Sequence, residues 1–321
     1  MPITARKQDA DRIGRRLKLR DLRILMTVAE CGTMGKAAER LAVSQPVVSK
    51  TISDMEHAVG VRLLDRSQRG VEPTPYGRAL IKRGVAIFDE MRQGLKEIEF
   101  LADPTTGEVR IGATNPIAAA IVLPVIDKLT REHPRMRFHV VVADTAPLFQ
   151  ALERRALDLV ITRIAQRIGD EQNAEILFHD EIVVATSADN PLTRKRRLAL
   201  ANLMNERWVL SPHDSFFGAL AADAFRAAGL EPPQPSVTTS SAAVRDGLLA
   251  TQRFLTVVTG FSLLLPQRRA DLKALPIKLS GTQQPVSIIT LKNRSLGPAV
   301  QLFIERVREI TKPLAKNGKN Q

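Results

Sequence analysis

The order of apolar and polar positions between residues 33 and 59 predicts two short helices joined by a tight turn. Thr33 can cap the start of a helix that ends near Leu41. Ser44 can cap the next helix, in which Pro46 falls within the first turn, where a missing backbone N–H group costs little. One face of this second helix is apolar, because its members recur at steps of four, three and four. They are Val48, Ile52, Met55 and Val59.

The opposite face of the second helix is polar at its N-terminal end. Short or forked side chains there can reach base edges and phosphates without a large desolvation cost, as a recognition helix in the DNA major groove requires. An ordinary amphipathic helix pair is the alternative interpretation of the same pattern. The polar positions are Gln45, Ser49, Lys50 and Ser53.

The segments on either side of this pair extend the pattern to a winged helix-turn-helix. Upstream, an apolar stripe followed by Cys31-Gly32 predicts a further helix and its end. Downstream, residues 61–74 hold a β-prone apolar run and the cations Arg66 and Arg69, which predicts a two-stranded wing with a basic tip. The upstream stripe is formed by Leu22, Leu25, Met26 and Ala29.

Residues 76–102 predict one long helix with an apolar seam of about three heptads. The polar flanks of this helix indicate that the seam needs a partner, which is either a second copy of the chain or the chain's own globular domain. Residues 103–107 break the pattern and predict a hinge. The seam consists of Ile81, Gly84, Phe88, Met91, Leu95, Ile98 and Ala102.

Strand-like and helix-like segments alternate from residue 108 to residue 311, which predicts a parallel sheet covered by helices. Polar residues stand at several of the predicted strand-to-helix turns. Helix starts offer unpaired N–H groups to an anion when they converge, although each such residue can also simply cap its own helix. The turn residues are Asn115, Thr145, Ser240 and Ser241.

The composition of the chain indicates the cellular compartment of the protein more clearly than its function. The chain holds 47 Lys and Arg against 34 Asp and Glu, a net charge of +13, and a basic chain is drawn to polyanions. The excess is spread along the chain, since residues 102–321 carry +7 of it, so a ribosomal or nucleoid protein would look similar. A single cysteine excludes an intramolecular disulfide, and no apolar run approaches the length of a membrane span. We therefore expect a cytoplasmic protein with no membrane partner.

Catalytic patterns are missing from the sequence. It contains no glycine-rich phosphate loop and no Ser/His/Asp nucleophile signature. His179, Asp180 and Glu181 are adjacent, but on a strand they point to different sides, which leaves too few ligands for a metal. The sequence thus predicts a protein that is not an enzyme, with no metal site and no cofactor.

The segment AAERLAVSQPVVSKTISDMEHAVGVRLLDRSQRGVEPTPYG, residues 37–77, closely resembles the DNA-binding segment of the LysR-type transcriptional regulators. The resemblance implies binding to a partly palindromic site in double-stranded promoter DNA, a homodimer that forms a homotetramer, and contact with RNA polymerase. A sequence-tolerant architectural or nucleoid protein is the alternative function. The expected DNA-binding residues are Thr33, Ser44, Gln45, Pro46, Ser49, Lys50, Ser53, Arg66, Arg69 and Thr74.

The same resemblance implies a two-lobed effector domain, similar to type 2 periplasmic binding proteins, with a small organic anion in the crevice. It places Arg163 at the crevice floor, where a guanidinium can hold a carboxylate or phosphate; a surface position is the alternative. Residues 250–256 depart from the glycine-rich turn common in the family and alter one wall. The expected effector-binding residues are Thr114, Asn115, Thr145, Arg163, His213, Ser215, Phe216, Ser240 and Ser241.

The expected fold class is α/β, with these parts in chain order. A mobile basic extension over 1–17 precedes a winged helix-turn-helix over 18–75, a linker and dimerisation helix over 76–102, a hinge over 103–107, an effector domain over 108–311 and a solvated tail over 312–321. Lobe I of the effector domain is expected over 108–167 and 274–311, and lobe II over 168–273.

Overall fold

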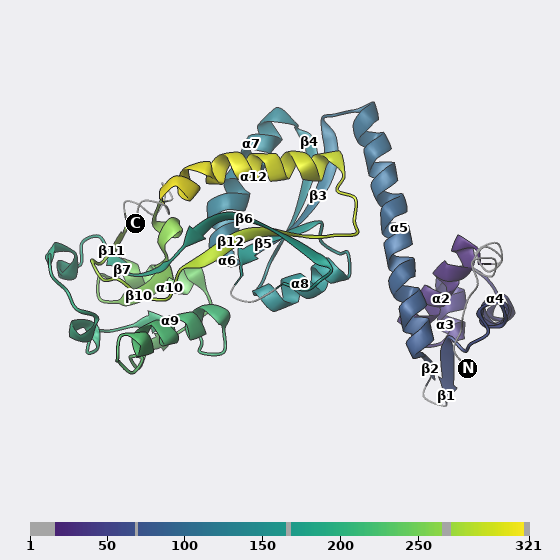
Figure 1. Ribbon diagram of the computed structural model, residues 1–321, viewed down its shortest axis with the longest axis horizontal. Coiled ribbons are helices and arrows are strands. Elements are labelled where there is room, and N and C mark those ends of the chain that lie inside the picture. The colour runs from purple at the N-terminus through teal and green to yellow at the C-terminus, as the bar shows by residue number, and fades with distance from the viewer. Residues whose placement is uncertain (1–16, 68–69, 165–167, 265–270, 318–321) are drawn as a thin grey trace. The chain divides into compact units, whose positions relative to one another are not determined.

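The computed structural model describes residues 17–67, 70–164, 168–264 and 271–317 (Figure 1). The chain divides into two compact units, with the boundary between Arg92 and Gln93. All of the expected basic extension except Leu17 lies outside the described residues. Among the helices within those ranges, none is both long and apolar enough to cross a membrane.

The N-terminal unit is a winged helix-turn-helix. The hydroxyl of Thr33 accepts a hydrogen bond of 3.3 Å from the N–H group of Lys36, as expected of a helix cap. Ser44 also stands at an N-cap, but its side chain makes no capping hydrogen bond, so that part of the prediction is wrong. The elements are α2 (Leu19–Cys31), α3 (Met34–Arg40), α4 (Gln45–Val59), β1 (Leu64–Ser67), β2 (Gly70–Pro73) and α5 (Pro75–Ala102).

Three helices of this unit share one hydrophobic core. The buried face of α4 follows the predicted period. The buried face of α2 is broader than predicted, because Ile24 and Val28 join it while Met26 and Ala29 are only half-buried. The main buried positions are Leu22, Ile24, Leu25, Val28, Ala37, Ala38, Val48, Ile52 and Met55.

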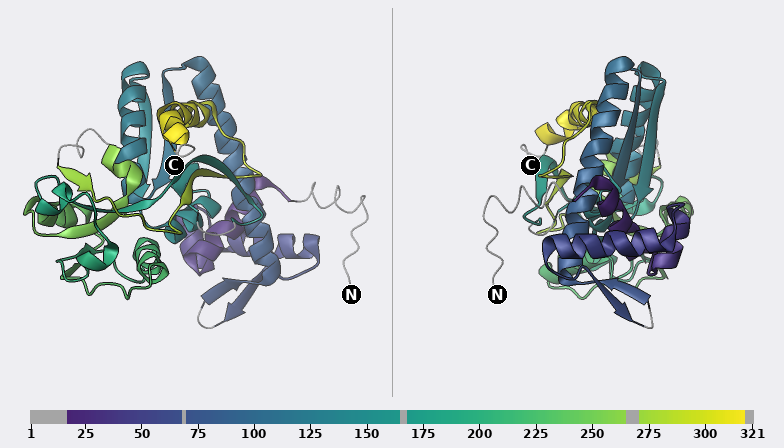
Figure 2. Two further views of the ribbon diagram at one scale, coloured as in Figure 1. Left: turned by 60° about the vertical axis from the view of Figure 1, so that its left-hand side comes forward. Right: turned by 90° about the vertical axis from the view of Figure 1, so that its right-hand side faces the viewer.

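Figure 2 shows the wing as a narrow hairpin of β1 and antiparallel β2. Two sets of hydrogen bonds fix it to the helices. The N–H group of Val71 donates to the carbonyl of Gly32 at 2.8 Å, and Glu56 Oε1 accepts from the N–H groups of Leu63 at 2.8 Å and Leu64 at 3.1 Å. The recognition helix and the wing therefore form one rigid body.

The long helix α5 is unbroken over 28 residues, and its apolar seam has two parts. Near the start, Ile81 is half-buried against the core of the N-terminal unit, so this part of the seam packs within the chain. Further along, the Arg23 guanidinium lies 4.8 Å from the ring centre of Phe88. In the second half of the helix, Met91, Leu95 and Ile98 are 49%, 62% and 64% exposed. Within the seam, only this second part offers an uncovered apolar surface.

Lobe I of the C-terminal unit is built on a five-stranded sheet of order β4-β3-β5-β12-β6. β3 is parallel to β4 and β5, whereas β12 is antiparallel to β5 and β6, so the expected parallel sheet is in fact mixed. Helices α7 and α12 cover one face and α8 covers the other (Figure 1). The elements are β3 (Thr106–Ala113), α6 (Asn115–Ile117), η1 (Ala118–Val122), α7 (Leu123–Glu132), β4 (Arg135–Val142), α8 (Thr145–Glu153), β5 (Leu159–Arg163), β6 (Gln172–Asp180), β12 (Gln284–Leu291) and α12 (Pro298–Asn317).

Lobe II surrounds the single tryptophan. Trp208 is fully buried, its Nε1–H group donates to the carbonyl of Leu203 at 2.9 Å, and its ring meets Phe225 edge-on at 5.4 Å. The strands form one sheet of order β10-β7-β11 and a second, parallel pair β8-β9. The elements are β7 (Ile182–Ser187), η2 (Pro191–Arg194), η3 (Leu200–Leu203), β8 (Val209–Leu210), α9 (Phe216–Ala227), β9 (Val237–Thr238), α10 (Ala242–Ala250), β10 (Leu255–Thr259), η4 (Gly260–Leu264) and β11 (Leu272–Ala274).

The lobe boundaries differ from the expected ones. β6 was expected in lobe II but lies at the edge of the lobe I sheet, because it pairs with β12. Leu275 and Leu279 were expected in lobe I but pack in the core around Trp208. The chain therefore crosses between the lobes after Asp180 and again before Gln284.

Two shorter segments also differ from expectation. Thr106 and Gly107 belong to β3, so the hinge is shortened to residues 103–105. The tail expected to be solvated from residue 312 instead continues α12 to Asn317, and Leu314 packs partly against the lobe I core. Residues 318–321 lie outside the described residues.

Candidate functional site

The N-terminal end of α4 presents most of the residues expected to contact DNA. Gln45, Pro46, Lys50 and Ser53 are exposed, and Ser49 is half-buried. They are held in place because the opposite face of the helix is locked into the core and Glu56 ties it to the wing. This end of the helix can enter a major groove, where amide and hydroxyl groups hydrogen-bond to base edges.

Two further residues of that set, Arg66 and Thr74, lie on or next to the wing in different environments. Arg66 is exposed on β1, as a phosphate contact requires. Thr74 is only 6% exposed, and its hydroxyl donates to the carbonyl of Arg62 at 2.8 Å and accepts from the N–H group of Gly77 at 3.0 Å. Thr74 is therefore a structural cap at the start of α5, and its assignment to DNA binding is wrong. Arg69 lies outside the described residues.

Val47 was not among the residues expected to contact DNA. This side chain is 40% exposed on the first turn of α4, beside Gln45 and Pro46. An exposed methyl group at this place can contact the C5-methyl group of thymine. The signal was present in the sequence, because Val47 falls outside the helical period that buries Val48 and Ile52.

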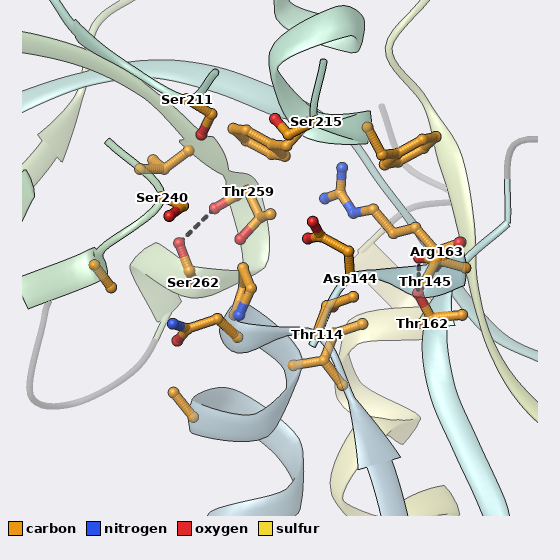
Figure 3. A pocket seen from close by; sticks show the side chains of 18 of the residues that line it. Thr114, Asp144, Thr145, Thr162, Arg163, Ser211, Ser215, Ser240, Thr259 and Ser262 are labelled. Carbon is orange, nitrogen blue, oxygen red and sulfur yellow. Dashed lines mark hydrogen bonds between the residues drawn. The ribbon is translucent and has the colours of Figure 1, made fainter. Parts of the chain in front are cut away.

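A second candidate site is a cavity of about 150 Å³ between the two lobes (Figure 3). Seven of the nine expected effector residues line it. The other lining residues come from both lobes and include four with hydroxyl groups, two phenylalanines and several aliphatic side chains. The expected residues present are Thr114, Asn115, Thr145, Arg163, Ser215, Phe216 and Ser240, and the most informative additions are Asp144, Thr162, Ser211, Phe217, Arg245, Thr259 and Ser262.

The starts of four helices, α6, α8, α9 and α10, border this cavity. The hydroxyl of Thr145, at the start of α8, is 2.8 Å from that of Thr162 on the neighbouring strand β5. At the start of α9, Ser215 accepts from the N–H group of Gly218 at 3.0 Å. A Cβ atom at Gly218 would overlap the carbonyl of Pro212, so glycine lets the loop that forms this wall pack directly on the helix. The cavity is therefore rich in oriented hydroxyl and N–H groups.

Arg163 ends β5 at the side of the cavity and is only 6% exposed. It forms an ion pair with Asp180, the last residue of β6, which is equally buried. Its Nε and Nη1 groups have no hydrogen-bond acceptor among the described residues. Burial lowers the pKa of the guanidinium to about 10, so Arg163 is charged at neutral pH. Because the side chain is buried, a surface position for Arg163 is excluded.

Two expected effector residues do not line the cavity. Ser241 instead caps α10, because its hydroxyl accepts from the N–H group of Val244 at 3.3 Å, while Ser240 beside it lines the cavity. His213 lies in the loop before α9 but is not among the lining residues. Of the residues that were missed, Asp144 matters most, since its carboxylate and the Arg163 guanidinium point into the same part of the cavity (Figure 3).

Comparison with known proteins covers both of these sites. Residues 19–78 match the bacterial regulatory helix-turn-helix proteins of the lysR family, and residues 102–312 match the LysR substrate binding domain. The chain belongs to the LysR family of transcriptional regulators. Members of the family combine a DNA-binding domain with an effector-binding domain, and nothing in the comparisons supports the architectural alternative.

Relatives and solved structures of the LysR family match nearly the whole chain. The transcriptional regulator GbpR of Azospirillum brasilense is 28% identical over 295 residues, which cover 91% of this chain and 86% of GbpR. GltC of Bacillus subtilis, a transcriptional dual regulator, is 26% identical, with 91% and 96% covered. A full-length OxyR variant from Pseudomonas aeruginosa shares the fold with a TM-score of 0.64 at 22% identity, covering 92% of this chain and 97% of OxyR. Full-length CbnR in complex with its target DNA gives a TM-score of 0.52 at 21% identity, with 92% and 100% covered.

Proposed function

We propose that this LysR-type regulator binds promoter DNA in the cytoplasm as a homo-oligomer and responds to a small organic anion held between its lobes. The observation that carries the proposal is the buried guanidinium of Arg163 at a cavity lined by hydroxyl groups from both lobes. The Nε and Nη1 groups of Arg163 lack acceptors within the described residues, and a carboxylate can accept a charge-assisted hydrogen bond from either of them. The cavity volume suits a ligand of few heavy atoms.

Asp144 restricts the chemistry of this anion. Its carboxylate also points into the cavity, so a ligand that carries only negative charge would be repelled there (Figure 3). A hydroxyl or ammonium group on the same ligand would donate a hydrogen bond to Asp144. The surrounding hydroxyls of Thr114, Ser211 and Ser240 can bind further polar groups. We therefore favour a hydroxy acid or an amino acid over a plain carboxylate.

A ligand that contacts both lobes favours the arrangement in which they are closed around it. Lobe I continues through residues 103–105 into α5, which leads to the DNA-binding unit. Closure can therefore change how paired DNA-binding units are presented to promoter DNA, and to RNA polymerase bound beside them. Coupling of this kind is reciprocal, so DNA must change the affinity for ligand by the same factor as ligand changes the affinity for DNA.

A thermal-shift screen of the full chain against small hydroxy acids, amino acids and the corresponding amides, which lack the carboxylate charge, tests this proposal. A ligand at a hundred times its dissociation constant adds about 2.7 kcal/mol of stability. The acid should raise the melting temperature and the amide should not. Ser240→Ala should reduce the shift, whereas Ser241→Ala, beside it on the chain, should lose only its helix cap and keep the shift. Equal shifts with acid and amide, or a full shift in both Ser240→Ala and Thr114→Val, would overturn the proposal.

A further inference from the structure

Four consecutive cations lie on the surface of lobe II, starting at the last residue of η2 and continuing towards η3. Each of them is exposed, and they follow one another in irregular, non-helical backbone after the first. The segment from Asn190 to Asn205 contains no acidic residue. The run, called the basic loop below, consists of Arg194, Lys195, Arg196 and Arg197.

The basic loop is held at both ends but has no packing role of its own. Leu192 before it and Leu200 after it are buried in the lobe II core, and Leu198 is half-buried against the same core. The hydroxyl of Thr193 donates to the carbonyls of Ala188 at 3.1 Å and Asn190 at 2.8 Å. These anchors fix the backbone on both sides while the four charged side chains remain in solvent. Core packing therefore does not explain the run.

Neutralisation within the chain does not explain it either. Some arginines elsewhere on the C-terminal unit do have partners: Arg306 bonds to Glu132 and Glu309, and Arg308 bonds to Glu175. No ion pair among the described residues includes a member of the basic loop. Asn190, four residues before the basic loop, donates a hydrogen bond to the carbonyl of Gln252 at 2.8 Å, and Gln252 is followed by a further exposed cation, Arg253.

We propose that the basic loop is a second DNA contact, which binds the phosphate backbone of duplex DNA without reading its sequence. Four residues of extended chain span up to about 13 Å, a length over which duplex DNA carries about eight phosphate charges. The +7 excess carried by residues 102–321 supports a polyanionic partner. A LysR-type chain already holds DNA through its other unit, so the effective concentration of phosphate near the loop is high, and even weak contacts contribute.

Fluorescence anisotropy with long random-sequence duplex DNA, from about 50 to 200 mM salt, tests this contact in the full chain. One variant replaces all four cations of the basic loop by glutamine. A matched control variant removes the same charge from exposed positions outside lobe II. It combines Arg137→Gln, Arg154→Gln, Lys292→Gln and Lys312→Gln.

Each lost phosphate contact makes the negative slope of log K against log salt shallower by about 0.9. We expect the slope to become shallower by about 2 to 4 in the basic-loop variant and by less than 1 in the control. Equal slopes in the two variants would overturn the proposal. So would a changed mass of the basic-loop variant in analytical ultracentrifugation with a wild-type slope, because the loop would then be a protein interface. The effector screen is independent of this result, so either proposal can fail alone.

Discussion

Arg163 and Asp180 form a buried ion pair where β6 leaves the lobe I sheet and the chain crosses into lobe II. The same carboxylate accepts a hydrogen bond of 2.9 Å from the N–H group of Phe261, at the start of η4. One side chain therefore joins the end of β5, the first lobe crossing and a segment that lines the cavity. In the function proposed above, an anion held at Nε or Nη1 of Arg163 shares the guanidinium with Asp180, which would connect ligand binding to the crossing.

Asp180→Asn should strongly destabilise the protein, because it leaves the Arg163 charge buried without its partner. The cost of breaking a buried pair in this way is about 3 to 5 kcal/mol. Replacing both partners by apolar residues, Arg163→Met with Asp180→Leu, should recover most of that loss. Urea unfolding of the three proteins measures it. A double variant no more stable than Asp180→Asn would mean that the pair is not the source of the effect.

Gln45→Ala should weaken binding to a site selected from random duplexes by about 1 to 3 kcal/mol and leave binding to random DNA nearly unchanged. Arg66→Ala should weaken both, because a phosphate contact carries no sequence information. His57→Ala, exposed in the last turn of α4, is the control and should change neither. Equal losses on both DNAs for Gln45→Ala would remove Gln45 from base recognition.

Leu95→Asp should lower the mass of the assembly in analytical ultracentrifugation and weaken DNA binding. Leu95 is 62% exposed on α5, so a charge there leaves the fold of the single chain intact but disrupts an apolar interface. Glu97→Lys changes an exposed position about 200° around the helix and should leave the mass unchanged. An unaltered mass for Leu95→Asp, with wild-type DNA affinity, would show that subunits pair elsewhere.

Gln252→Gly should raise stability by roughly 0.5 to 1 kcal/mol, as judged by the shift in melting temperature. Gln252 follows the C-cap of α10 with φ of 65°, a left-handed conformation that favours glycine. This residue lies in the turn where the chain departs from the glycine-rich pattern expected from the family resemblance. Gln172→Gly, on strand β6 with ordinary extended backbone, should destabilise instead. A loss of stability for Gln252→Gly would contradict the strain at this turn.

Glu175→Gln should cost less than about 1 kcal/mol at neutral pH, because the ion pair with Arg308 is half-exposed. Hydrogen bonds from Arg308 lower the pKa of Glu175 below its ordinary value of 4.5. Its contribution is therefore present above that value and is lost as the pH falls through the lowered pKa. Wild type and variant should converge in acid unfolding curves below pH 4.5. A gap that widens on acidification would contradict the assignment.

Local pattern sufficed where a residue's role depends on its own neighbours in sequence. The period of Val48 and Ile52 located the buried face of α4, and the turn at Thr145 located one wall of the cavity. It failed where the partner is remote. Thr74 is buried against the segment that contains Arg62, whose carbonyl accepts its hydrogen bond. β6 belongs to lobe I because it pairs with β12, which lies far along the chain.

The sequence also could not show which of two adjacent residues of the same type lines the cavity. Ser240 and Ser241 are chemically identical and adjacent, yet only the first lines the cavity. Which of the two does so depends on where the first turn of α10 begins, and helix starts cannot be located to a single residue from propensity alone. The partner of Arg163 could not be identified for another reason, since Asp180 was one of three adjacent polar residues on a predicted strand, and nothing in the local pattern connects it to Arg163.

The unbroken course of α5 limits how this regulator can change length during evolution. Each residue added to or removed from a helix turns everything beyond it by about 100° and moves it by about 1.5 Å. A single deletion between Ile81 and Leu95 would turn the later part of the apolar seam by about 100° around α5 relative to the earlier part, so the seam would no longer lie along one side of the helix. Insertions of about seven residues nearly restore its alignment. Related chains should therefore keep the length of α5, or alter it by whole heptads.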